Sequence, residues 1–149
     1  MAIPPRSPSS ASSASPADPL NLIRSFTGTR GPNPALDKLQ ARDDAAAWLR
    51  GTGLLAADAG LSNSEHAALI RLRDAARDVL AAQAGHREDP DAAARLTRAL
   101  AEGRLFVTVG PAGSVRLTTA ARSSYPSVVA GIAVAIADCA AAGTWATAG

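Results

Sequence analysis

The sequence is poor in several residue types, and each shortage excludes a class of protein. Cys139 is the single cysteine among 149 residues, so neither an intramolecular disulfide nor a cysteine-rich zinc site can form. Aromatic residues make up 3% of the chain and 36 residues are alanine, which leaves little large apolar surface to bury. A homodimer that buries more surface would suit this composition. We expect a modest core around a few large side chains, namely Trp48, Phe106, Tyr125 and Trp145.

Lysine and long hydrophobic runs are also scarce. Lys38 is the only lysine, and the formal net charge is only +2. This balance argues against a strong non-specific nucleic-acid binder, because such affinity rises with the number of phosphates neutralised. The apolar run Val128–Ala142 contains Asp138 and is shorter than the roughly 18 residues of a membrane span. The N-terminus has no apolar core of a signal peptide, so we expect a cytoplasmic protein without membrane contact.

The chain divides into three parts by composition. Residues 1–18 are rich in Pro, Ser and Ala and are predicted to be disordered. Residues 19–146 are expected to form a single domain, followed by terminal residues 147–149. Within the domain, apolar residues recur at helical spacing in four to five segments. Alternating residues around the turn Gly110–Gly113 indicate a two-stranded hairpin. The predicted fold class is mainly α with a β-hairpin (α+β), a helical bundle with the hairpin packed on its side.

Several segments occur in an order that resembles a known family. The segments are Leu22–Thr29, Ala46–Leu55, the arginine-bearing helix Leu69–Leu80, the hairpin, and Gly143–Trp145. Together they resemble the ABATE domain over residues 20–146. The resemblance implies a bacterial, stress-induced transcription regulator in which this domain precedes a CGNR zinc finger. The finger would contact DNA, and the larger domain would sense a ligand or form a dimer.

The sequence departs from the family pattern at two places. Gly28 stands where the family has Asn, which removes a side-chain amide from a polar pocket. After Trp145 the sequence continues with Ala-Thr-Ala-Gly, without the cysteines of a zinc finger. We therefore expect a finger-less or truncated member of the family, whose own contact with DNA is weak or depends on the missing finger.

Four residues are the candidates for a ligand pocket: Arg24, Thr29, Trp48 and Arg73. Arg73 occupies the Leu-Arg position of the family motif, and its guanidinium could bind a carboxylate or phosphate with two hydrogen bonds. An anionic or aromatic small molecule would suit this set. The alternative for Arg73 is an internal partner, either Asp74, Asp78 or a carbonyl of the N-terminal segment.

No pattern in the sequence indicates catalysis or a bound cofactor. His66 and His86 have no partner at metal-ligand spacing, Cys139 lies on an apolar helix stripe, and the glycines after Phe26 lack the Gly-Lys-Ser/Thr ending of a phosphate-binding loop. The function predicted first is non-enzymatic ligand sensing or dimerisation, without cofactor or metal. Direct nucleic-acid binding by the arginine-bearing helices is the alternative, and a small enzyme is a third.

Overall fold

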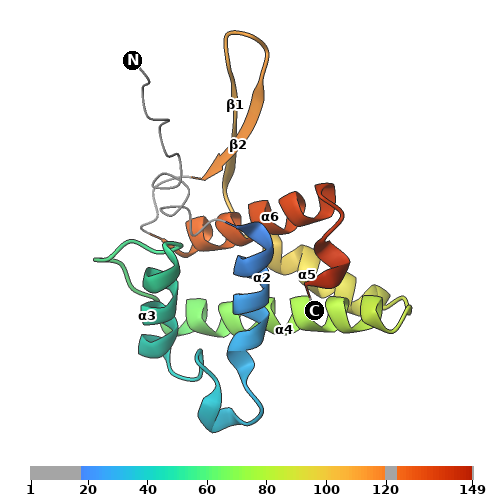
Figure 1. The fold of residues 1–149 in the computed structure, drawn as a ribbon. Coiled ribbons are helices and arrows are strands. Elements are labelled where there is room, and N and C mark those ends of the chain that lie inside the picture. Colours follow the sequence, from blue (N-terminus) through green and yellow to red (C-terminus); the bar gives the residue numbers. More distant parts are fainter. Residues whose placement is uncertain (1–17, 120–123, 149) are drawn as a thin grey trace, which may run out of the picture.

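The computed structural model describes residues 18–119 and 124–148, and in them five α-helices surround one core (Figure 1). The predicted mainly α fold with a hairpin is confirmed. The predicted tail, residues 1–18, lies outside the described residues except for Asp18. The elements are α2 (Pro19–Thr27), η1 (Gly28–Arg30), η2 (Pro34–Leu36), α3 (Arg42–Thr52), α4 (Asn63–Ala84), α5 (Pro90–Leu100), β1 (Leu105–Val109), β2 (Val115–Thr119), α6 (Tyr125–Ala141) and η3 (Trp145–Thr147), where η denotes a 3-10 helix.

Local sequence signals set the helix boundaries. Helix α4 begins with a capping box, in which the Ser62 side chain accepts from the Glu65 backbone and the Glu65 side chain accepts from the Ser62 backbone. The same helix ends at Ala84, with Gly85 as its C-cap. Neither Asp43 nor Asp44 is the N-cap of α3, which is Ala41. They lie in its first turn, where negative charge favours the positive end of the helix dipole.

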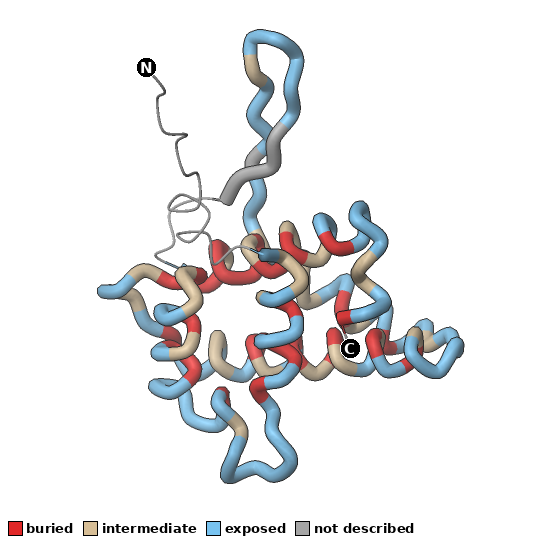
Figure 2. The backbone as a smooth tube through the Cα atoms, viewed as in Figure 1, coloured by how far each residue is buried: buried red, intermediate tan, exposed pale blue. Residues whose placement is uncertain are grey.

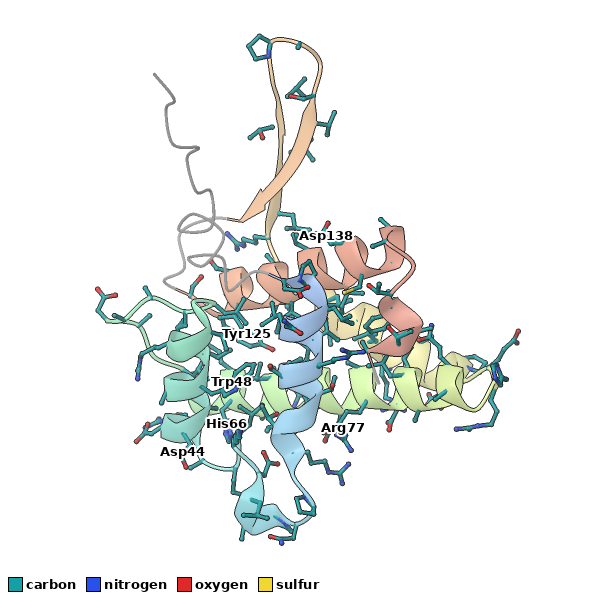
Figure 3. All side chains as sticks on the ribbon, viewed as in Figure 1. Asp44, Trp48, His66, Arg77, Tyr125 and Asp138 are labelled. Carbon is teal, nitrogen blue, oxygen red and sulfur yellow. The ribbon has the colours of Figure 1, made fainter. Side chains whose placement is uncertain are left out.

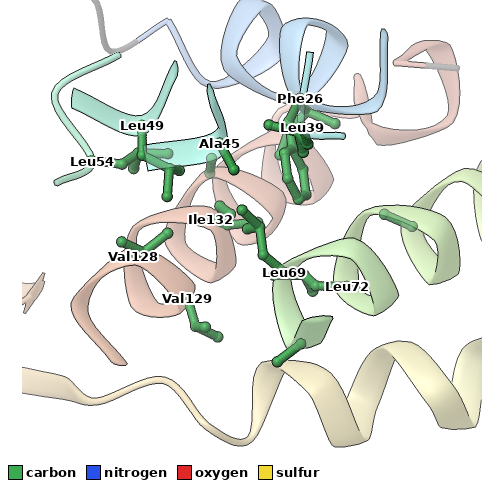
Figure 4. Close-up of a cluster of buried hydrophobic side chains, with 14 of the residues drawn as sticks. Phe26, Leu39, Ala45, Leu49, Leu54, Leu69, Leu72, Val128, Val129 and Ile132 are labelled. Carbon is green, nitrogen blue, oxygen red and sulfur yellow. The ribbon is translucent and has the colours of Figure 1, made fainter. Parts of the chain in front are cut away.

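Helix α4 packs against α2, α3 and α5, and α6 packs against α2 and α5. Helix α2 crosses in front of both α4 and α6, and α5 lies behind them (Figure 1). Their buried faces meet in the centre of the molecule (Figure 2). The close-up in Figure 4 shows the resulting cluster, which includes Phe26, Leu39, Leu49, Leu69, Leu72, Val128, Val129 and Ile132.

The hairpin is confirmed, but it extends away from the helices instead of packing on their side (Figure 1). Its strands pair antiparallel, from Leu105 opposite Thr119 to Val109 opposite Val115. Gly103 explains how the chain leaves the bundle: a Cβ there would lie 2.9 Å from the backbone nitrogen of Ala130. Only glycine lets the backbone pass this close to α6 before the strands begin.

The expected large core residues differ in how far they are buried. Tyr125 and the thiol of Cys139 are buried, whereas Trp48 and Trp145 are half-buried at the edge of the core. Trp48 lies beside Phe26, with ring centroids 5.9 Å apart. The Phe106 side chain lies outside the described residues. The core therefore relies on aliphatic side chains from α2, α4 and α6 more than on aromatic rings.

Leucines in two environments test where the stability resides. Leu69 is 0% exposed and Leu36 is 57% exposed. We expect Leu69→Ala to lower the free energy of unfolding by about 2–5 kcal/mol, because it leaves a cavity in the core. The matched Leu36→Ala should change it by less than about 0.5 kcal/mol. Urea denaturation followed by circular dichroism measures both, and equal effects would contradict the described core.

Candidate functional site

Arg73 of α4 holds a buried ion pair. Its side chain is 3% exposed, and its Nη1 donates to Asp37 Oδ1 at 2.7 Å. Its Nε donates to Asp74 Oδ1 at 3.1 Å, and Nη1 also lies 3.5 Å from the Thr29 hydroxyl. Asp37 follows η2, so these bonds fasten the connection between α2 and α3 to the surface of α4.

The surroundings of Asp37 lower its pKa. Burial by itself would raise the pKa of this carboxyl group, but the hydrogen bond from Arg73, the backbone N–H of Leu39 and the charges of Arg73 and Arg30 outweigh it. The net pKa of Asp37 is below its ordinary value. For Arg73, burial opposes the charged form, yet the bonds to Asp37 and Asp74 raise its pKa above the ordinary value. The pair is therefore ionised near neutral pH.

The charged residues near Arg73 that the sequence analysis named also have partners inside the protein. The predicted pairing of Arg73 with Asp74 is present. Asp78, the second expected partner, instead accepts from Arg95 of α5 at 3.1 Å. A carbonyl of the N-terminal segment is indeed bound by an arginine of α4, but the donor is Arg77, whose Nη1 lies 2.6 Å from the Thr27 oxygen.

A groove of about 410 Å³ lies between α2 and α4. Arg24 of α2 and Arg77 of α4 stand beside it, and Figure 3 shows Arg77 extending from α4 next to α2. Arg24 Nη2 donates to the carbonyl of Thr147 in η3 at 3.1 Å. The groove is lined by Arg24, Thr27, Gly28, Arg77, Leu80, Ala81, Ala84 and Ala148.

The two arginines of this groove have no carboxylate partner within residues 18–119 and 124–148. Each guanidinium has five N–H donors, and the bonds described above use one donor of Arg24 and one of Arg77, both to neutral backbone carbonyls. The remaining wall is largely apolar, with Leu80 and Ala81 from α4. The arrangement offers positive charge and free donors beside an apolar surface.

The structure separates the four residues predicted to form one pocket. Arg73 and Thr29 lie together, and the Thr29 hydroxyl donates to the Phe26 carbonyl at 2.6 Å. Trp48 is on α3, and of the four only Arg24 lines the α2–α4 groove. Sequence reasoning did not assign Arg77 to the pocket, although its position one helical turn after Arg73 was the available signal.

A second cleft, of about 500 Å³, lies between α4 and α5. It contains Arg71, Arg95 and Arg98, and also the carboxylates of Asp74 and Glu102. Within the described part of the chain, no three His, Cys, Asp or Glu side chains are placed to hold a metal ion. No helix among the same residues has the length and apolar character needed to cross a membrane.

The Asp37–Arg73 pair predicts a pH dependence. A carboxyl group whose pKa is lowered in the folded state stabilises the fold above its unfolded pKa, and this contribution disappears as the pH falls through the folded pKa. Asp37→Asn should lower the free energy of unfolding at pH 7 by about 1.5–3 kcal/mol. The difference from the unchanged protein should shrink below about pH 4.

Urea denaturation at pH 7, 5 and 3.5 measures this difference. The control is Asp91→Asn, which removes an exposed partner of Arg95 and should cost under about 1 kcal/mol. A pH-independent effect of Asp37→Asn would show that the carboxylate charge is not what stabilises the pair.

Comparisons with known proteins identify the family. The family model ABATE, described as "Putative stress-induced transcription regulator", matches residues 19–143. The searches of curated proteins and of solved structures gave no match. The matched region contains all five described α-helices, the hairpin, the Asp37–Arg73 pair and both arginines of the α2–α4 groove. The chain belongs to the ABATE family.

Proposed function

We propose that this domain is a non-enzymatic sensor of a transcription regulator, and that its α2–α4 groove binds a small carboxylate ligand. The family description supports a regulatory role. The observation that carries the ligand proposal is the pair of arginines, Arg24 and Arg77, which border the groove without a carboxylate partner in the described residues.

The chemistry of the groove favours an anion with an apolar body. A carboxylate would replace neutral carbonyl acceptors with charge-assisted hydrogen bonds, which are about twice as strong. Leu80, Ala81 and Ala84 would contact the ring or alkyl part of the ligand. The volume of about 410 Å³ is within the range of small-molecule sites, roughly 300–1,000 Å³. Arg73 takes no part, because carboxylates of the chain already occupy it.

Binding in the groove would be transmitted through η3. Arg24 holds the carbonyl of Thr147, and the adjacent Ala148 is 3% exposed and lines the groove. We infer that the carboxylate takes the same Nη2 donor of Arg24 that now bonds to Thr147, and so competes with η3. Gly143, with φ of 76°, forms the turn between α6 and η3. The ligand would shift the population of this segment from a docked to a released position.

Direct nucleic-acid binding has weaker support. Arg71 and Arg98 of the α4–α5 cleft are exposed, but Asp74 and Glu102 line the same cleft. Those carboxylates would repel phosphate groups. The groove between α2 and α4 has no Asp or Glu in its lining, and for this reason we favour ligand sensing.

Benzoate and benzamide together test the groove. We expect isothermal titration calorimetry to detect benzoate binding, and benzamide, which has the same ring without the charge, to bind at least tenfold more weakly. Arg24→Gln and Arg77→Gln should each weaken benzoate binding about tenfold, the equivalent of 1.4 kcal/mol. Arg98→Gln, an exposed arginine of the other cleft, is the control. Unchanged benzoate affinity in both groove variants would refute the site.

Trp145 reports the proposed movement of η3. The chain has two tryptophans, so Trp48→Phe leaves Trp145 as the single fluorophore of its kind. Saturating benzoate should shift the emission of this variant to longer wavelength, because the half-buried Trp145 becomes exposed to water. In the reciprocal Trp145→Phe variant, emission from Trp48 should stay constant. Benzoate binding without a Trp145 shift would leave the groove in place and contradict the release of η3.

A further inference from the structure

Gly28 is a glycine that neither the backbone nor the packing around it requires. It directly follows α2 with φ of −78° and ψ of −7°, a right-handed helical conformation that any residue adopts. Apart from its neighbours in the chain, a Cβ at this position would meet no heavy atom of the described residues within 4 Å. Gly103 differs, because its Cβ would press against the backbone of α6. The space beside Gly28 is therefore open to a side chain that the sequence does not supply.

This open space belongs to the α2–α4 groove. The backbone N–H of Gly28 donates to the Arg24 carbonyl, so the helical turn continues through this residue. Residues four apart in a helix share a face, and both Arg24 and Gly28 line the groove. A side chain at position 28 would therefore extend from the face of α2 that borders the groove, next to the side chain of Arg24.

The opposite wall of the groove has the same order of residues. On α4, Arg77 is followed by Ala81 after one turn and by Ala84 after two, and all three line the groove. Their spacing places them on one face of the helix. Each helix thus contributes an arginine and, four residues later, a residue with at most a methyl side chain. Two positive charges lie beside a part of the groove that small residues keep wide.

We propose that Gly28 determines the specificity of the groove, and that the space it leaves admits carboxylates with a fused two-ring body. The inference rests on the proposed function, because Arg24 and Arg77 have to bind the carboxylate. The second ring would lie against the backbone of Gly28 and remove further apolar surface from water. It also fills more of the groove of about 410 Å³ than a single ring does. A larger residue at position 28 would take this space and leave both arginines in place.

Isothermal titration calorimetry with benzoate and 2-naphthoate tests the role of Gly28. The full chain should bind 2-naphthoate about fivefold more tightly than benzoate, because the second ring buries more apolar surface. Gly28→Leu should lower the ratio of the two association constants by about tenfold or more, since the new side chain clashes with the second ring. Arg77→Gln should weaken both ligands about tenfold and keep their ratio, because it removes charge and not space. The matched control is Gly51→Leu, which should leave both affinities unchanged.

Gly51 is a suitable control because it is also exposed and helical, has the same open space around its Cβ, and does not line the groove. Urea denaturation verifies that both leucine variants are folded. If neither carboxylate binds the unchanged chain, the proposed function fails and the role of Gly28 with it. If both bind, but Gly28→Leu keeps their ratio or Gly51→Leu changes it equally, the groove remains a carboxylate site and the specificity role of Gly28 is overturned.

Discussion

The side chain of Arg73, on α4, is buried, and the surrounding structure supplies partners for its charge. A buried charge costs several kcal/mol unless it is paired and hydrogen-bonded. Asp37 and Asp74 supply the opposite charges, and Thr29 adds a hydroxyl oxygen. Asp37 and Thr29 both come from the connection between α2 and α3. Satisfying one arginine therefore fixes the connection between α2 and α3, with η1 and η2, against α4.

This pairing decides which arginines remain for a ligand. Arg73 is paired with Asp37 and Asp74, whereas Arg77, one turn further along α4, bonds to the backbone carbonyl of Thr27 in α2. Arg24 faces the same groove and bonds to another carbonyl, that of Thr147. Neutral acceptors hold both groups in place, and the proposed carboxylate ligand would replace them. The bonds of Arg73 to Asp37 and Thr29 hold the α2–α3 connection against α4. The groove is lined by residues of α2 and α4 and by Ala148, which follows η3.

Much of the fold could be predicted from local sequence. Ser62, Glu65 and Gly85 mark the ends of α4, because capping and glycine termination depend only on neighbouring residues. The alternation of Leu105, Val107 and Val109 identifies a strand in the same way. The direction of the hairpin could not be predicted, since it depends on the approach of Gly103 to Ala130. The ordered motifs of α2, α3 and α4 led to the correct family.

The site was harder to predict than the fold. The partner of Arg73, Asp37, is 36 residues away in the sequence, and no helical or strand spacing connects them. The predicted pocket grouped Arg24 with Arg73, but the structure places only Arg24 at the α2–α4 groove. Which arginine is internally paired depends on how the α2–α3 connection folds back, and this is a property of the tertiary structure.

The most direct measurement is a titration of the arginine Nε–Hε signals with benzoate, followed by two-dimensional nuclear magnetic resonance. The account predicts that the signals of Arg24 and Arg77 move with benzoate concentration while that of Arg73, bonded to Asp74, stays in place. Assignment is made with the Arg24→Gln, Arg77→Gln and Arg73→Lys variants. A titration that moves the Arg73 signal and leaves Arg24 and Arg77 unchanged, or that moves none of the three, would contradict it.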